Sequence, residues 1–433
     1  MTFRRLVIRP GSGPLGTDTF AWQGRGDESS FHTNLDPELR DFGDLPLLHR
    51  DLVTFATGVF LADRTVTRPK SWRRTIELEV PVSDVATWES LADHFAEILE
   101  ILSSDSWQLI FRQRPNPKEL TVATHPEVDR ILLFSGGADS LCGAIRSLAD
   151  GKRLLLVSHW DWSGHSAVQQ RLGRKLAAQF PEQVILRRIH LARRSRQVGG
   201  GAFNDEATRR TRSLLFLSLG LAAASVEPVT PLWVAENGYT ALNPPLAGER
   251  RGALSTRTTH PLVLSRVHDA ICSLGGRAEF ENPFVSMTKG EMYADAAAAL
   301  GKENAEKILA MSHSCSHIRY AQGTGYPAET QCGICFGCLV RRAAFHAAAM
   351  TDTTTYLHKA IPTAGQPHHL RATAESEVRT VRYAGQRGLD IADILSIGLP
   401  DHVGVDDAIS VAERGLAELA AVVDAEPDLR AVR

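Results

Sequence analysis

The stretch Ser135-Gly136-Gly137-Ala138-Asp139-Ser140 decides the fold of this chain. It follows the apolar run 131–134, which is typical of a buried parallel strand, and precedes residues 141–148, whose apolar positions recur at helical spacing. Unpaired amides at a helix start attract anions, and glycines let the backbone approach a ligand closely. The order of strand, glycine turn and helix therefore predicts a phosphate site, although Ser and Asp would also suit a plain helix N-cap.

A second signal is a group of cysteines about two hundred residues further on. Cys332, Cys335 and Cys338 have C-x-x-C-x-x-C spacing, and Cys315 lies upstream. Four thiolates suit tetrahedral Zn²⁺ in a closed structural site, but an iron–sulfur cluster also takes four thiolates. Disulfides are disfavoured, because the chain has six cysteines in 433 residues and no recognisable signal peptide.

Composition indicates a cytoplasmic globular protein rather than a membrane protein or a nucleic-acid-binding one. The formal charge is −2 and the pI is near neutral, so bulk electrostatics give nucleic acid no advantage. No apolar stretch reaches the roughly 20 residues that span a bilayer. The remaining cysteines, Cys142 and Cys272, fall on apolar helical faces and are expected in the core.

The pattern along the chain predicts three parts. Residues 1–125 are expected to form an α+β module, residues 126–350 an α/β domain that carries the glycine turn and the cysteine group, and residues 351–433 a mostly helical extension. Strands and helices alternate in the middle part, which favours a parallel sheet with helices on both faces and a nucleotide at the carboxyl ends of its strands. The expected strands are 6–8, 75–80, 107–111, 130–134, 153–158, 183–190 and 231–235, and the expected helices are 85–102, 138–149, 165–179, 205–225, 373–384 and 405–424.

The glycine stretch resembles the SGGxDS loop of the PP-loop ATP pyrophosphatases, enzymes that split ATP into AMP and pyrophosphate. The resemblance implies a doubly wound parallel α/β sheet of the adenine nucleotide alpha hydrolase-like kind, and binding of ATP with Mg²⁺. By the same resemblance, the nucleotide-binding residues are Ser135, Gly136, Gly137, Asp139 and Ser140, and Asp139 and Ser140 are also candidate catalytic residues.

The cysteine group narrows this resemblance. A PP-loop followed by C-G-x-C-x-x-C-x-x-R is similar to the 7-cyano-7-deazaguanine synthases, the QueC-type enzymes of queuosine biosynthesis. The similarity runs over residues 128 to 350 and includes the segments around Arg212 and Lys289. Both side chains are candidates for stabilising phosphoryl charge. The structural alternatives are a surface lysine at a helix start for Lys289 and a helix salt bridge for Arg212.

Polar residues that follow the strand at 231–235 are candidates for binding the substrate. Glu236, Asn237 and Asn243 come after its carboxyl end, so they can reach the same cleft and recognise the edge of a purine-like base. His165 is a candidate for packing on the ring. Asn and Glu are also common in turns, so a purely structural role stays open for these residues.

Several segments depart from the synthase pattern, notably 159–165 and 236–245. This combination resembles the QueC-like branch found in bacterial anti-phage defence operons, the Qat type. The resemblance implies ATP-dependent activation of 7-carboxy-7-deazaguanine and its transfer to an amine, such as the N-terminal amino group of a partner protein from the same operon. The alternatives are nitrile synthesis with ammonia, tRNA thiolation, and a non-catalytic nucleotide-binding scaffold. A homo-oligomer is compatible with each of them.

Overall fold

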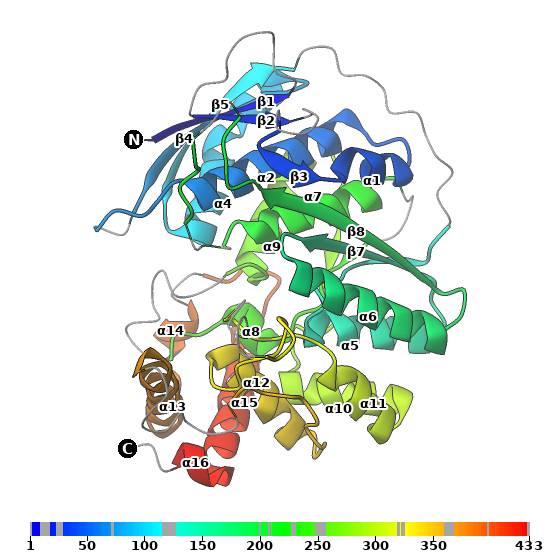
Figure 1. The fold of residues 1–433 in the computed structure, drawn as a ribbon, viewed down its shortest axis with the longest axis vertical. Coiled ribbons are helices and arrows are strands. Elements are labelled where there is room, and N and C mark those ends of the chain that lie inside the picture. Colours follow the sequence, from blue (N-terminus) through cyan, green and yellow to red (C-terminus); the bar gives the residue numbers. More distant parts are fainter. Residues whose placement is uncertain are drawn as a thin grey trace.

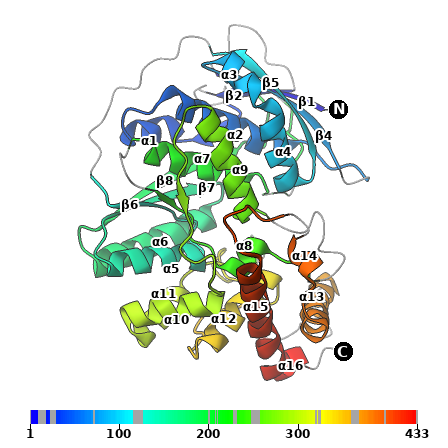
Figure 2. The same cartoon turned by 180° about the vertical axis from the view of Figure 1, so that it is seen from behind.

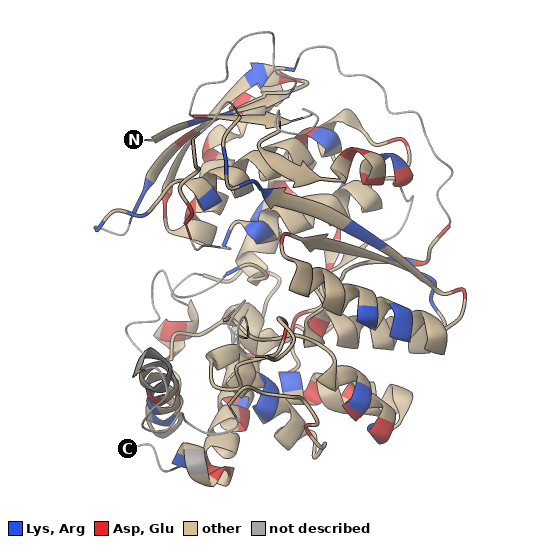
Figure 3. Ribbon diagram, viewed as in Figure 1, with Lys and Arg blue, Asp and Glu red and all other residues tan. Residues whose placement is uncertain are grey.

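The computed structural model describes most of the chain (Figure 1). No helix among the described residues is both long and apolar enough to cross a membrane. Basic and acidic residues are interspersed over the ribbon in the view of Figure 3, in keeping with the formal charge of −2. The described residues are 2–8, 18–22, 29–70, 73–114, 127–198, 201–206, 208, 210–226, 231–246, 257–317, 321, 325–358, 368–395 and 398–430.

The secondary structure falls into three stretches along the sequence. The first contains β1 (Thr2–Ile8), β2 (Thr19–Trp22), β3 (Phe31–Thr33), α1 (Leu35–Asp41), α2 (Leu47–Thr65), β4 (Thr75–Val82), α3 (Val85–Ser90), α4 (Ala92–Ser103) and β5 (Ser106–Gln113). The second contains β6 (Arg130–Leu133), α5 (Ala138–Ala149), β7 (Leu154–Trp160), α6 (Ser163–Gln179), β8 (Val184–Arg193), α7 (Arg212–Ala224), β9 (Leu232–Trp233), α8 (Gly238–Leu242), α9 (Pro261–Ser273), β10 (Phe280–Glu281), α10 (Lys289–Leu300), α11 (Lys302–Ala310) and α12 (Phe336–Ala347). The third contains α13 (His368–Arg387), α14 (Ile391–Leu395), α15 (Val405–Ala425) and α16 (Pro427–Arg430).

The central sheet confirms the predicted parallel α/β architecture. Its strand order is β10-β9-β6-β7-β8-β3, and every pairing is parallel except that of β3 with β8. The four predicted strands of the middle part are present as β6, β7, β8 and β9. The antiparallel edge strand β3 was not expected, because it comes from the N-terminal region and has only three residues.

Both faces of this sheet are buried, as alternation along β6 shows. Ile131 and Leu133 join the core that contains α2 and α7, whereas Leu132 and Phe134 join the core that contains α5 and α6. Successive side chains of a strand point to opposite faces, so a continuous apolar run marks a strand covered on both sides. This explains why the run 131–134 was a reliable signal.

The N-terminal region contains a second sheet, with strand order β2-β1-β4-β5. Its three pairings are all parallel, so the described part of residues 1–125 is α/β rather than α+β. Helices α2 and α4 lie between this sheet and helices α7 and α9 of the central domain (Figures 1 and 2). One continuous apolar core runs from Leu6 to Ala278 and joins the two sheets through these helices.

Some predicted helices have different bounds from those observed. The helix expected over 85–102 is two helices, α3 and α4, which meet at Leu91. The helix expected over 205–225 begins only at Arg212. The C-terminal helices near 373–384 and 405–424 are present as α13 and α15, and α15 packs on α8 and α12 (Figure 1).

Replacing Gly143 with alanine is expected to separate α5 from the sheet. A Cβ atom there would lie 2.5 Å from the Cβ of Ala235 and 3.0 Å from Leu132 Cδ1. Overpacking of this kind destabilises proteins by about 1–3 kcal/mol, more than the roughly 1 kcal/mol that alanine gains in helix propensity. The urea midpoint of G143A should therefore fall, whereas G201A, which meets nothing within 4 Å, should leave it unchanged. Equal midpoints for the two variants would contradict this packing.

Candidate active site

The glycine loop after β6 is shaped by its own hydroxyl groups. Gly136 has φ of 84°, a conformation that favours glycine. The Ser135 hydroxyl accepts a hydrogen bond from Gly137 N at 3.1 Å, and the Ser140 hydroxyl donates to the Gly137 carbonyl at 3.0 Å. Gly137 is the N-cap of α5, and no side chain caps that helix. No capping side chain therefore accepts a hydrogen bond from the first amides of α5. The N-cap alternative would require such a side chain.

Asp139 is the centre of a small polar cluster in the first turn of α5. One carboxylate oxygen forms an ion pair with Lys289 Nζ at 2.7 Å, and both side chains are largely buried, at 12% and 9% exposed. The other oxygen accepts hydrogen bonds from Asn237 Nδ2 at 2.8 Å and from Asn237 N at 3.3 Å. Three predicted site residues from separate parts of the chain thus meet at one carboxylate.

Sheet topology explains why these residues converge. After β6 the chain builds β7 and β8 on one side, and then crosses to place β9 and β10 on the other side. Ligands of open α/β sheets bind at such a switch point, outside the carboxyl ends of the strands. Asp139 follows β6 and Asn237 follows β9, so both lie at this position.

Lys289 is the first residue of α10, and its side chain reaches the Asp139 cluster from there. Thr288 is the N-cap and forms a capping box with Glu291. Burial, the largest single effect, would lower the pKa of the Lys289 ammonium. The Asp139 carboxylate, helped by Tyr293 and Glu236, more than offsets burial and holds that pKa above its usual range. Lys289 is therefore a buried cation at the glycine loop rather than a surface lysine.

Glu236 is a buried carboxyl group beside this ion pair. It accepts a hydrogen bond from the Thr240 hydroxyl at 2.5 Å, and Asn282 holds its backbone through bonds to both N and O. Burial, and secondarily the negative charge of Asp139, raise the pKa of Glu236 to about 7. The group can therefore change its protonation state near neutral pH.

Asn237 is occupied by structural hydrogen bonds. Its Nδ2 donates to Asp139 and to the Thr240 hydroxyl at 2.6 Å, and its Oδ1 accepts from Thr240 N at 3.0 Å. Asn243 ends α8 in a left-handed conformation, with φ of 45°, and does not line either of the two cavities that flank the glycine loop. The structure therefore brings Glu236 and Asn237 to Asp139, whereas Asn243 lies at the C-terminal end of α8.

Arg212 and His165 lie on the other side of the glycine loop. They line a cavity of about 240 Å³ together with Ser135 and Gly137. Arg212 donates to His159 Nδ1 at 3.1 Å and to the His159 carbonyl at 2.8 Å. Thr211 is the N-cap of its helix α7, and the Thr211 hydroxyl donates to Asp63 of the N-terminal region at 2.8 Å.

A further cavity of about 200 Å³ opens over Asp139 and Lys289. Sequence reasoning missed several residues of its wall, because they lie in or beside the cysteine group, which was interpreted only as a metal site. His313 is the clearest example, since its backbone N donates to the Gly136 carbonyl at 3.0 Å. The lining residues are Gly137, Ala138, Asp139, Thr240, Lys289, His313, Ser314, Phe336, Gly337 and Val340.

The four predicted metal ligands gather in one buried cluster. The sulfur atoms of Cys315, Cys332, Cys335 and Cys338 all lie within 4.8 Å of one another. The Cys332–Cys338 and Cys315–Cys335 sulfur pairs are 3.9 and 3.8 Å apart, too far for disulfides of about 2.05 Å. Tetrahedral Zn²⁺ with bonds of roughly 2.3 Å places its sulfurs about 3.8 Å apart. The cluster is therefore consistent with a single zinc ion, whereas a cluster of several irons would spread the sulfurs further.

The two remaining cysteines have different environments. Cys142 is buried in α5, as expected. Cys272 is exposed in the last turn of α9, so the core position predicted for it was wrong. The helix buries the face that carries Val263, Val267 and Ile271, and residue 272 lies beside that face rather than on it.

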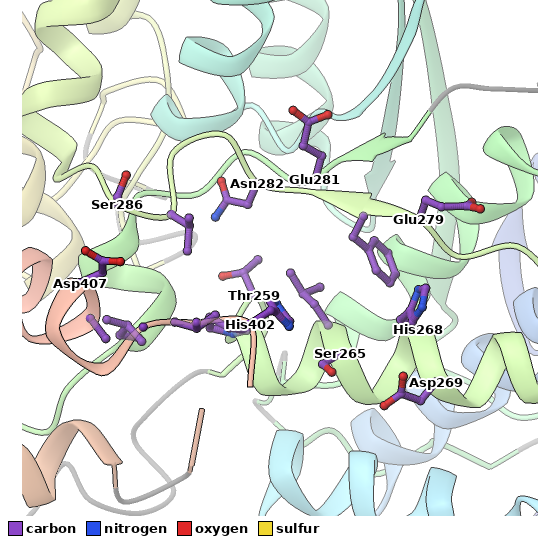
Figure 4. Close-up of a pocket in the computed structure, with 18 residues that line it drawn as sticks. Thr259, Ser265, His268, Asp269, Glu279, Glu281, Asn282, Ser286, His402 and Asp407 are labelled. Carbon is purple, nitrogen blue, oxygen red and sulfur yellow. The ribbon is translucent and has the colours of Figure 1, made fainter. Parts of the chain in front are cut away.

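A larger cavity, of about 670 Å³, lies away from the glycine loop (Figure 4). It is bounded by α9, by the edge strand β10, and by the segment that leads into α15. Asn282, which also holds the Glu236 backbone, is part of its wall. This cavity contains none of the predicted site residues.

Comparison with known proteins supports a distant relationship to one enzyme class. No protein-family model matches the chain. The chain is 28% identical over 245 residues to a 7-cyano-7-deazaguanine synthase from Novosphingobium aromaticivorans, which covers 52% of this chain and 93% of that protein. It is 26% identical over 249 residues to 7-cyano-7-deazaguanine synthase 1 from Sphingopyxis alaskensis, which covers 52% of this chain and 97% of that protein. The chain is thus similar to these synthases over about half its length.

Substituting Cys335 with serine is expected to remove the metal. A structural zinc site contributes directly to folding, so C335S should lose bound zinc and at least about 2 kcal/mol of unfolding free energy. Elemental analysis of the purified protein and urea unfolding measure the two effects. C272S, at an exposed thiol outside the cluster, is the matched control and should change neither. Full stability of a metal-free C335S would rule out a structural metal.

Replacing Glu236 with glutamine should change how stability depends on pH. The folded-state pKa of Glu236 is about 7, above its ordinary value of 4.5. Its stabilising contribution is therefore present below pH 4.5 and is lost as the pH rises through about 7. In thermal melts, the melting temperature of E236Q minus that of wild type should therefore increase as the pH rises from 4.5 to about 7. E89Q, at an exposed glutamate, should show no such trend. A constant difference from pH 5 to 8 would contradict the raised pKa.

Proposed function

We propose that this protein activates a 7-deazaguanine carboxylic acid with ATP and transfers the acyl group to an amine. The observation that carries the proposal is the meeting of the uncapped start of α5, Asp139 and Lys289 at the switch point of the sheet. The distant similarity to 7-cyano-7-deazaguanine synthases supplies the substrate class.

The glycine loop has the groups that a triphosphate needs. The amides at the start of α5 and the hydroxyls of Ser135 and Ser140 would bind phosphate oxygens. Asp139 is the carboxylate that lines the adjoining cavity, and would hold Mg²⁺ together with phosphate oxygens. Lys289 and, from the opposite side, Arg212 are cations placed to offset the negative charge.

The first step converts a poor electrophile into a reactive one. An oxygen of the substrate carboxylate attacks the α-phosphorus of ATP, the bond to the bridging oxygen breaks, and pyrophosphate leaves. The product is an acyl adenylate, a mixed anhydride whose leaving group is AMP. Charge builds up on the departing pyrophosphate, so the cations and amides at the loop act on the step where they matter most.

The second step transfers the acyl group to an amine. The amine attacks the carbonyl carbon, AMP leaves, and the nitrogen releases one proton as the amide forms. We propose that the acceptor is the N-terminal amino group of a partner protein in an anti-phage defence system. The departures of residues 159–165 and 236–245 from the synthase pattern support an acceptor larger than ammonia.

Within this proposal the residues of the site have distinct tasks. Glu236, whose carboxyl group is buried beside the ion pair, is the candidate for recognising the base. Asn237 orients Asp139 rather than reading the base, since both of its amide hydrogens are already donated. His165 borders the Arg212 cavity and is the candidate for contact with the substrate ring.

Measuring the intact masses of candidate partner proteins can identify the amine acceptor. Candidate partner proteins are incubated with the enzyme, ATP, Mg²⁺ and 7-carboxy-7-deazaguanine, and their intact masses are measured. A mass increase equal to the acid minus water would establish amide formation on the partner. Free nitrile with an unmodified partner would instead establish the ammonia-dependent reaction, and absence of pyrophosphate release would contradict both.

Removing the Lys289 ammonium should impair adenylation. Without it the Asp139 carboxylate is left buried without its cation, and the leaving pyrophosphate loses a positive charge. K289A should lower ATP–pyrophosphate exchange by about 10²-fold or more. K302A, at an exposed lysine that starts the next helix, is the control and should retain full exchange. Wild-type exchange in K289A would exclude the proposed role.

A further inference from the structure

We infer that helix α15 of the C-terminal extension is a positioning element of the active site, because it holds the starts of both helices that supply the partners of Asp139. This inference rests on the proposed function. The two partners are Lys289, at the start of α10, and Asn237, the N-cap of α8. Helix α15 contacts α8, α10 and α12 (Figures 1 and 2).

Glu418 holds the first turn of α10 directly. Its carboxylate accepts a hydrogen bond from the Thr288 hydroxyl and a second one from Gly290 N at 3.1 Å. These two residues flank Lys289. A Cβ atom on Gly290 would lie 2.5 Å from Glu418 Oε1, so the absence of a side chain there is what allows the approach. A negative charge at this place also suits the positive end of the α10 dipole.

Arg414, one turn earlier in α15, holds the same helix start through different partners. Its Nε donates to Glu291 at 2.9 Å, and its Nη2 donates to the Ser286 carbonyl at 2.6 Å. Glu291 is the capping-box residue of α10. Residues 286 to 291, with Lys289 among them, are thus fixed by two side chains of α15 as well as by their own cap.

The contact with α8 depends on close packing rather than on charge. A Cβ atom on Gly415 would lie 2.3 Å from Cγ of Tyr239, so the α15 backbone lies directly against that ring. A Cβ atom on Gly238 would lie 2.9 Å from Val411 Cγ2 and 2.0 Å from the Val285 carbonyl oxygen. Gly238 and Tyr239, the first two residues of α8, are therefore closely packed between α15 and the loop that leads into α10.

One rigid helix thus fixes both groups that hold Asp139. Catalytic groups must stay within about 0.5 Å of their productive position, and small displacements reduce rates strongly. Movement of α15 would displace Lys289 and Asn237 together. Glu418, Arg414 and Gly415 are positioning residues in this sense, because none of them lines the cavity over Asp139.

The test compares Glu418 with a neighbour on the same helix. E418Q keeps the size of the side chain but leaves one of its two donors without an acceptor, and E418A removes both acceptors. E413Q, at an exposed position of α15, is the control. With ATP and 7-carboxy-7-deazaguanine, E418A should lower kcat for pyrophosphate exchange on the order of tenfold, while KM for ATP changes little. E418Q should be intermediate, and E413Q should match wild type.

Hydrogen exchange provides a readout that does not depend on activity. In E418A, amides of residues 236–242 and 286–293 should exchange faster, whereas those of residues 141–149 should be unchanged. Faster exchange throughout the chain would indicate general destabilisation and overturn the inference, as would unchanged exchange at both helix starts. If the wild-type protein shows no pyrophosphate exchange, the proposed function fails, while the exchange pattern still decides whether α15 fixes the two helix starts.

Discussion

The ion pair between Asp139 and Lys289 is the interaction on which the site depends. Both groups are largely buried, and breaking a buried pair by removing one partner typically destabilises a protein by about 3–5 kcal/mol. The two residues come from α5 and α10, which are far apart in the sequence. The pair can form only after the central sheet has brought these helix starts together, so it connects the site chemistry directly to the topology.

The sheet was largely predictable from the sequence, because its signals are local. The apolar run 131–134 and the glycine turn that follows it specify a strand and a helix start within a dozen residues. The predicted strands of the middle part are all present, and α5 has the predicted bounds. The four cysteines could likewise be grouped from spacing alone. These features need no knowledge of the rest of the chain.

The errors lie where distant contacts decide the outcome. Helix α2 was not predicted, because it buries residues on all sides, including Asp51 and Asp63, and so lacks a polar face. Strand β3 has only three residues and depends on β8 for its pairing. In each case tertiary contacts override the local pattern.

The N-terminal and C-terminal regions each supply a carboxylate to a helix start at the candidate site. On one side, Asp63 of α2 accepts hydrogen bonds from Thr211 at the start of α7, next to Arg212. On the other side, Glu418 accepts from Thr288 and Gly290 at the start of α10. Each contact joins a carboxylate to a helix N-terminus, where unpaired amides and the helix dipole favour negative charge.

This arrangement bears on how the chain should be divided. The alignments with the synthases cover 52% of the chain, so about half of it lies outside them. Yet the apolar core that contains Leu6 and Phe111 continues to Ile131 and Val267 without interruption. Side chains of the outer regions also bond directly to the helices that carry Arg212 and Lys289. The regions beyond residues 126–350 are therefore better regarded as supports of the candidate site than as appended modules, because removing either one would leave a helix start at that site without its carboxylate partner.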